Sequence, residues 1–259
     1  MSTVGFIVAT CVRTYEHMKS LEACIQSILV FYEPKQVVII VDFTSNPSMI
    51  QIMQHQFPYV RFETDVPSVP ADMVMLYFFK KNHYFDLAIT LQDSMVILKR
   101  FDVEHIKDIE YLWHFTNHRL HWSTIVEPQT EFNIANNIHV HDDLNMYCIK
   151  HMIDNTAFRE YCMEIYPQKE KWSGSLGSLS LIRYDALIGL DAATGIIDLM
   201  LKMNTNRLRR VIESLFGLAC QFYLQKEIHS SYDDLYYDGL SGGHGLISEH
   251  IKKISFDRQ

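Results

Sequence analysis

The sequence predicts an α/β fold, in which a mostly parallel central sheet is flanked by helices within one domain. Short apolar runs typical of buried strands alternate with helical patterns over the first 100 residues. The run at 37–41 is apolar at every position, as expected of a strand covered on both faces. The length of 259 residues fits one domain, and a hydrophobic content of 48% can fill its core.

The first strand is expected at 6–12, and a helix follows it. Apolar residues in this helix recur at the spacing of a single helical face. They are Leu21, Cys24, Ile25, Ile28 and Leu29. We expect the helix to end near Glu33, because Pro34 disfavours helical geometry in the residue before it. The next elements are a strand at 37–41, a helix at about 47–56, a strand around 59–63, a helix at 71–83 and a strand at 87–91.

Polar residues follow three of these strands. Thr10 and Arg13 lie at the end of the first, Asp42 at the end of the second, and Asp93 at the end of the strand at 87–91. Ligands of parallel sheets bind at the carboxyl ends of the strands. These side chains are therefore the first candidates for a functional site.

The second half of the chain is less regular. The stretch 101–170 is rich in histidine and aromatic residues and predicts no clear boundaries. A loop at 172–178 precedes a strand at 179–182, and two helices are expected near 185–203 and 206–228. The sequence has no internal repeat or linker, so a single domain over 1–259 is the simplest interpretation.

Composition excludes several classes of protein. The 23 basic and 31 acidic residues leave a formal charge of −8, which argues against a surface that binds nucleic acid or anionic lipid. Only Gly5 precedes Gly174, so the first two-thirds of the chain hold neither a P-loop nor a glycine-rich dinucleotide turn. The five cysteines contain no C-x-x-C pair, which favours a reducing compartment. No apolar run approaches the ~20 residues of a membrane span. We therefore expect a cytoplasmic protein, or one peripheral to a membrane.

Three segments resemble a known family. They are the strand ends carrying Thr10, Arg13, Asp42 and Asp93, the segment 172–182, and the helical segment 209–217. Their order and spacing over roughly 4–220 are similar to those of GT-A fold glycosyltransferases, which use nucleotide sugars, and in particular to family 2. The resemblance implies a Rossmann-like GT-A domain. Residues 1–100 would bind the nucleotide sugar, 101–228 the acceptor, and 229–259 would form a loop and tail.

The resemblance also implies roles on the donor side. Thr10 and Arg13 would line the nucleotide, and Asp42 would accept a hydrogen bond from its base or ribose. Gln92-Asp93-Ser94 would occupy the position of the metal-binding D-x-D motif, but only its central residue is acidic. Either Asp93 binds Mn²⁺ or Mg²⁺ with help from Ser94, or metal binding is weak or absent. Further candidates lie in the tail: His244 for metal or phosphate and Lys252 for phosphate.

On the acceptor side, the resemblance points to Trp172, Gly174, Ser175 and Gly177. Glu213 is the candidate general base, which would deprotonate the acceptor hydroxyl in an inverting transfer. Asp191 is the reserve candidate. The alternative for Glu213 is an ordinary helix-surface carboxylate paired with Arg209 or Arg210, which lie one turn before it.

The resemblance thus implies a hexosyl- or deoxyhexosyltransferase that moves a sugar from a nucleotide-diphosphate donor to a carbohydrate hydroxyl, assisted by metal. A second hypothesis is a catalytically silent domain that binds sugar or nucleotide, since the D-x-D position is degenerate. A third is a zinc hydrolase. His114, His118 and His121 have the spacing of one helical face, and imidazoles are zinc ligands.

Overall fold

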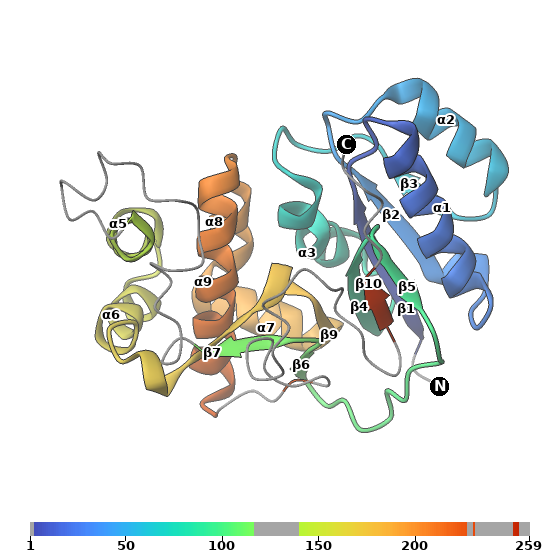
Figure 1. Cartoon of the computed structure of the whole chain (residues 1–259). Helices are drawn as coiled ribbons and strands as arrows, with labels where there is room; N and C mark the ends of the chain where they lie inside the picture. The colour runs from blue at the N-terminus through green and yellow to red at the C-terminus, as the bar shows by residue number, and fades with distance from the viewer. Residues whose placement is uncertain (1–2, 117–139, 227–229, 231–250, 254–259) are drawn as a thin grey trace.

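The computed structural model describes residues 3–116, 140–226, 230 and 251–253 (Figure 1). Its centre is a six-stranded sheet in the order β3-β2-β1-β4-β9-β6. Strands β1 (Val4–Thr10), β2 (Val37–Val41), β3 (Arg61–Glu63) and β4 (Leu87–Gln92) pair in parallel. Strand β9 (Ser180–Arg183) is antiparallel to both β4 and β6 (Ile109–Tyr111). The predicted α/β class with a mostly parallel sheet is confirmed.

Helices cover both faces of this sheet. Helices α1 (Tyr15–Leu29) and α2 (Pro47–Gln56) lie on one face, and α3 (Ala71–Asn82) lies on the other (Figure 1). Strands β2 and β3 are added in chain order on one side of β1. After α3, strand β4 pairs with β1 on its other side. The order in which strands are added to the sheet therefore reverses between β1 and β4. This position is a topological switch point, where open α/β sheets bind ligands.

The local signals explain why α1 forms where it does. Its buried residues include Leu21, Cys24, Ile25 and Ile28, as the apolar spacing predicts. The Thr14 side chain accepts a hydrogen bond from the His17 amide and caps the first turn. The helix ends at Leu29, earlier than expected, and Pro34 instead begins a short 3₁₀ turn over Pro34–Gln36.

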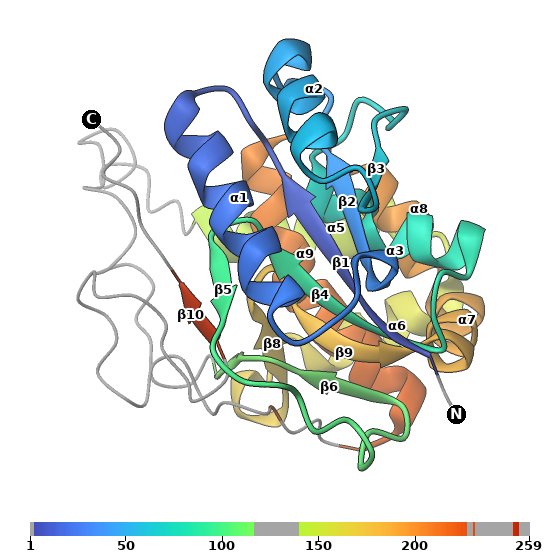
Figure 2. The same ribbon diagram turned by 90° about the vertical axis from the view of Figure 1, so that its right-hand side faces the viewer.

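Beyond β4, the chain forms short strands that the sequence did not predict. Strand β7 (His114–Thr116) pairs with β8 (Ser173–Ser175), and β5 (Met95–Ile97) pairs with β10 (Ile251–Lys253). The stretch without predicted boundaries also holds α5 (Val140–Met152) and α6 (Thr156–Ile165). These two helices pack side by side, away from β1 in Figure 1 and behind the central sheet in the turned view of Figure 2.

The predicted helix at 185–203 is two helices, α7 (Tyr184–Thr194) and α8 (Ile196–Leu201). Gly195 separates them with a left-handed φ of 70°, which glycine adopts without steric cost. Helix α9 (Asn206–Leu224) follows, close to the predicted bounds. Helices α7 and α8 pack on α3, and α9 packs on β8. Within the described ranges, no helix combines the length and apolar character that crossing a membrane requires.

Candidate active site

The carboxyl ends of β1 and β4 hold the first part of the candidate site. The pairing of Ala9 with Gln92 places the two strand ends side by side. Buried Thr10 donates from Oγ1 to Asp93 Oδ2 at 2.6 Å, and the Cys11 amide donates to the same oxygen at 3.3 Å. The end of β1 therefore orients the Asp93 carboxylate. Burial raises the pKa of the Cys11 thiol, which keeps it neutral.

Asp42, at the end of β2, is buried and organises the neighbouring loop. Its Oδ1 accepts hydrogen bonds from the Thr44 amide at 2.9 Å and the Thr44 hydroxyl at 2.5 Å. Its Oδ2 accepts from the Ala71 amide at 3.1 Å, so the carboxylate also caps the first turn of α3. The exposed Arg13 donates to Thr44 Oγ1 from Nε at 3.1 Å and from Nη2 at 2.5 Å. Thr44, which the sequence did not single out, joins the two predicted residues.

Gln92 and Glu213 come close to each other through Gly177. The Gly177 amide donates to Glu213 Oε1 at 2.9 Å. A Cβ on Gly177 would lie 3.1 Å from Gln92 Nε2, and the residue has a left-handed φ of 57°. The candidate base on α9 thus contacts the loop that lies against the residue before Asp93. The partly exposed Ser94 follows Asp93 in the turn between β4 and β5.

Arg209, one of the two arginines that Glu213 was expected to pair with in the alternative interpretation, forms an ion pair with a different residue. Arg209 Nε lies 2.6 Å from Oδ2 of Asp72 in the first turn of α3, an ion pair that lacks the alignment of a hydrogen bond. Burial raises the pKa of Asp72 despite the opposing effect of Arg209. The side chain of Arg210 lies outside the described residues. Of the two proposed ion pairs of Glu213, the one with Arg209 is therefore replaced by a contact between α9 and α3.

Two glycines allow close packing around β8: Gly174 makes room for Phe115 of β7, and Gly217 lets α9 approach the strand. A Cβ on Gly174 would lie 2.0 Å from the Phe115 ring, and a Cβ on Gly217 would lie 2.1 Å from the Ser173 carbonyl oxygen. Gly174 therefore has a packing role in this structure. The hydroxyls of Ser175 and Ser178 are buried and find no hydrogen-bond partner among the described residues. Ser178 also has a left-handed φ of 57°, which is uncommon outside glycine.

Trp172 belongs to the core. It is only 3% exposed, and its indole Nε1 donates to the Tyr166 carbonyl oxygen at 3.1 Å. Its ring stacks on that of Tyr166, with centroids 5.2 Å apart. In this arrangement the indole face is covered by protein, so Trp172 does not present it to an acceptor sugar.

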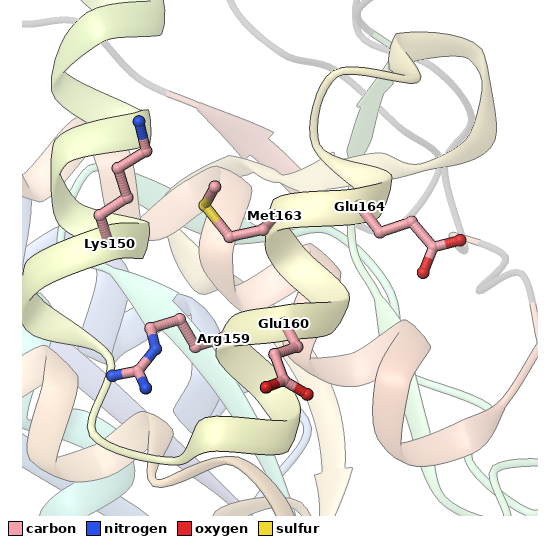
Figure 3. Close-up of a pocket in the computed structure, with 5 residues that line it drawn as sticks. All are labelled: Lys150, Arg159, Glu160, Met163 and Glu164. Carbon is pink, nitrogen blue, oxygen red and sulfur yellow. The ribbon is translucent and has the colours of Figure 1, made fainter.

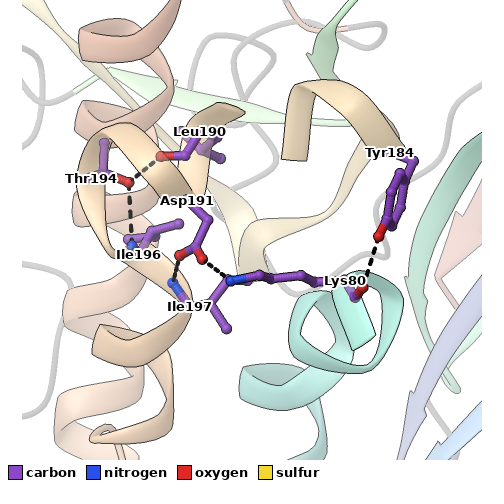
Figure 4. Close-up of polar contacts among 7 residues, drawn as sticks. All are labelled: Lys80, Tyr184, Leu190, Asp191, Thr194, Ile196 and Ile197. Carbon is purple, nitrogen blue, oxygen red and sulfur yellow. Dashed lines mark hydrogen bonds and ion pairs between the residues drawn. The ribbon is translucent and has the colours of Figure 1, made fainter. Parts of the chain in front are cut away.

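Asp191, the reserve candidate base, lies apart from Asp93 and Glu213. Its carboxylate accepts from Lys80 Nζ at 2.5 Å and from the Ile197 amide at 2.9 Å (Figure 4). Lys80 lies in the last turn of α3, which precedes the amino end of β4, whereas Asp93 follows the carboxyl end of that strand. The structure therefore gives Asp191 a role in joining α3, α7 and α8.

The predicted residues of the tail are only partly described. Lys252 is exposed on β10 and pairs with Val96, close in sequence to Asp93. His244, His118 and His121 lie outside the described residues. His114 lies on strand β7, where its Nδ1 is 2.7 Å from Ser230 Oγ, so it is not on the helical face that the zinc hypothesis requires. Among the described residues, no three His, Cys, Asp or Glu side chains are grouped to hold a metal ion.

A separate open pocket lies between α5 and α6, with a volume of about 470 Å³ (Figure 3). Its lining residues are Lys150, Arg159, Glu160, Met163 and Glu164. These helices stand on the opposite side of the molecule from β1 and β2 (Figure 1). The pocket includes none of the residues predicted for the site, so the candidate site is defined by the contacts at the sheet edge.

The comparisons with known proteins identify no family. No protein-family model matches the chain, and no curated protein matches it by sequence. Among solved structures, the chain is similar to core-mannan synthase A from Aspergillus fumigatus in its Mn/GDP form. The TM-score is 0.44 and the identity 8%, over 88% of this chain and 72% of that one. A likeness this remote leaves function to be inferred from the site.

Proposed function

We propose that this chain is a GT-A type glycosyltransferase that moves a sugar from a nucleotide-diphosphate donor to a carbohydrate hydroxyl. One observation carries the proposal: Glu213 accepts a hydrogen bond from Gly177, and Gly177 lies against Gln92, the residue before Asp93 at the switch point of the sheet. Such a transfer needs one carboxylate at the donor, here Asp93, and a second carboxylate that accepts the proton of the acceptor hydroxyl, here Glu213.

On the donor side, the proposed nucleotide site runs along the ends of β1 and β2. The linked Arg13, Thr44 and Asp42 offer a guanidinium, a hydroxyl and a carboxylate to a base or ribose. Thr10 holds Asp93 in place and is itself buried. Lys252 on β10 would bind the phosphates, and Gln92 would also contact them. The acidic net charge of −8 makes such local cations important for binding a diphosphate.

The residues at β4 fit a divalent cation that shares its coordination with substrate. Asp93 and Ser94 supply hard oxygen ligands, and Mg²⁺ in proteins is commonly bound by one or two carboxylates, with phosphates and water completing the shell. When bound, Mn²⁺ or Mg²⁺ would neutralise the charge of the departing diphosphate. His244 remains a further proposed ligand.

Glu213 is the proposed base of an inverting transfer. The Gly177 amide fixes one carboxylate oxygen, which limits how the side chain can rotate. Glu213 would take the proton of the acceptor hydroxyl as that oxygen attacks the anomeric carbon and the nucleotide diphosphate leaves from the opposite face. Acceptor contacts are proposed along the Ser175–Gly177 loop, next to this carboxylate.

A silent binding domain is the second candidate. Asp93 is the one acidic residue of Gln92-Asp93-Ser94, and both oxygens of Asp42 already accept internal hydrogen bonds. Such a domain would bind nucleotide or sugar at the same place without turnover. Binding alone therefore does not distinguish the two candidates, whereas the chemistry of Glu213 does.

The test combines binding with turnover. Thermal stability is followed while Mn²⁺ and a panel of nucleotide diphosphates are titrated, and a ligand at a hundredfold excess over Kd should stabilise the fold by about 2.7 kcal/mol. A panel of nucleotide sugars with carbohydrate acceptors then measures transfer. Absence of any stability shift with every nucleotide would contradict the proposal.

Glu213→Gln is the decisive variant. Glutamine keeps an oxygen that can accept from the Gly177 amide, so we expect normal nucleotide binding with transfer reduced about 10²–10⁴-fold. Glu164→Gln, an exposed glutamate on α6, is the matched control and should leave transfer unchanged. Nucleotide binding without transfer in the wild type would favour the silent domain instead.

A further inference from the structure

The contact between Asp72 and Arg209 joins the first turns of two helices. Asp72 is the second residue of α3 and is 6% exposed. Arg209 stands near the start of α9, with its Nε 2.6 Å from Asp72 Oδ2. Glu213 follows Arg209 by one helical turn, so both residues lie on the same side of α9. The ion pair is therefore a contact that ties the base-bearing part of α9 to α3.

The contact connects two parts of the proposed site. On α3, the residue before Asp72 donates its amide to Asp42, which ends β2. On α9, Glu213 accepts from the Gly177 amide, beside Gln92 at the end of β4. Polar contacts thus lead from the nucleotide side of the site, through Asp72 and Arg209, to the base and the loop that meets the acceptor.

The buried environment of Asp72 opposes the charge of its carboxylate. Burial raises the pKa of Asp72, and nearby Asp42 adds to the rise, while Arg209 opposes it without cancelling it. Folding therefore favours a neutral group at this position over a carboxylate. Removing one partner of an ion pair is costly mainly when the other charge is left buried, and the Arg209 side chain is 39% exposed, so its charge can reach water when Asp72 is neutral.

We propose that the Asp72–Arg209 ion pair is a positioning device for Glu213, an inference that rests on the proposed role of Glu213 as the base. By holding the first turns of α9 against α3, the pair keeps the Glu213 carboxylate at the Gly177 amide. Neither Asp72 nor Arg209 touches the reacting atoms in this account. Both act through the orientation of α9.

The experiment uses Asp72→Asn, which removes the charge and keeps the shape, and Arg209→Lys, which keeps the charge. The control is Lys80→Gln, which breaks the other ion pair of α3, with Asp191. Hydrogen exchange of the Gly177 amide, measured by NMR, reports whether Glu213 stays in place. Steady-state kcat and KM report the transfer, and urea unfolding reports stability.

We expect Asp72→Asn to accelerate exchange of the Gly177 amide about tenfold or more without lowering global stability. Its kcat should fall about tenfold or more while donor KM stays within about twofold, because misplacement of a catalytic group affects the chemical step. Arg209→Lys should retain most of both properties, and Lys80→Gln should change neither.

Unchanged exchange at Gly177 in Asp72→Asn would overturn the inference, as would an effect that Lys80→Gln reproduces. Faster exchange in a protein that transfers no sugar would support the contact as the device that positions Glu213 and would overturn the proposed function instead. The amide readout therefore separates the failure of one from the failure of the other.

Discussion

The two ends of α3 make ion pairs of opposite character. At the first turn, Asp72 faces Arg209 with its side chain 7% exposed, and burial raises the pKa of the carboxyl. At the last turn, Lys80 faces Asp191 with its side chain 44% exposed, and the hydrogen bond from the ammonium to Asp191 raises the pKa of Lys80. The first environment opposes the charge of Asp72, whereas the second favours the charge of Lys80.

This difference separates stabilisation from placement. The Lys80–Asp191 pair joins α3 to α7 with charges that the fold favours, and it lies apart from Asp93 and Glu213. The Asp72–Arg209 pair holds a charge against its environment and leads to the candidate base. In this proposal the Lys80–Asp191 pair of α3 joins the helices of the fold, and the Asp72–Arg209 pair orients the candidate site.

The largest change should come from forcing α9 away from β8. Gly217→Ala places a Cβ 2.1 Å from the Ser173 carbonyl oxygen, a backbone atom that cannot rotate away. We expect it to lower the free energy of unfolding by about 3 kcal/mol, measured by urea denaturation. Gly189→Ala on α7 is the matched variant, because its Cβ meets the hydroxyl end of the Tyr223 side chain, which can move. Equal losses in the two variants would contradict the close packing of α9 as described.

The next effect is a pH dependence of stability that originates at Asp72. An acid whose pKa is raised by folding stabilises the native state below its ordinary pKa of about 3.9, and that contribution is lost as pH rises through the raised value. The groups facing Asp72 are Arg209 and Asp42. We therefore expect the unfolding free energy of Asp72→Asn, relative to the wild type, to increase from about pH 4 towards neutrality.

Urea unfolding at a series of pH values measures this difference. Lys80→Gln is the control, since the raised pKa of Lys80 keeps it charged throughout the window. A difference between Asp72→Asn and the wild type that does not vary with pH would show that folding does not shift the titration of Asp72.

The smallest effect should come from the Lys80–Asp191 pair. Lys80 is 44% exposed and Asp191 is 10% exposed, and ion pairs at the surface contribute about 0–1 kcal/mol. The Asp191 carboxylate keeps its hydrogen bond from the Ile197 amide in this variant. If Lys80→Gln lowered the free energy of unfolding as much as Gly217→Ala does, the two ion pairs of α3 would not differ in the way described.

The sequence predicted best where a signal is local and repeated. The helical face of Leu21, Cys24 and Ile28 located α1, and the apolar run at 37–41 located β2 within its bounds. The clustering of Thr10 with Asp93 followed from the rule that carboxyl ends of parallel strands share an edge. The break at Gly195 was missed, because a single glycine within a helical pattern is commonly tolerated.

Contacts between distant segments could not be predicted in this way. Glu213 accepts a hydrogen bond from the Gly177 amide and Arg209 pairs with Asp72, and no spacing in the sequence links either pair. Short strands such as β7 and β8 offer too few residues for a period to show, so the strand that holds His114 was not predicted. Trp172 was expected to meet sugar, but the sequence did not indicate that Tyr166 covers its ring.

The position of β9 in the sheet has a consequence for how the protein is made. The strand that pairs with β4 on the side away from β1 is β9 (Ser180–Arg183), which is translated long after β1 to β4. A nascent chain can therefore assemble the parallel strands while the backbone groups along one side of β4 remain unpaired, and such an edge invites pairing with other chains. A fragment that ends near residue 100 should aggregate for the same reason, and coexpression of the remainder should rescue its solubility.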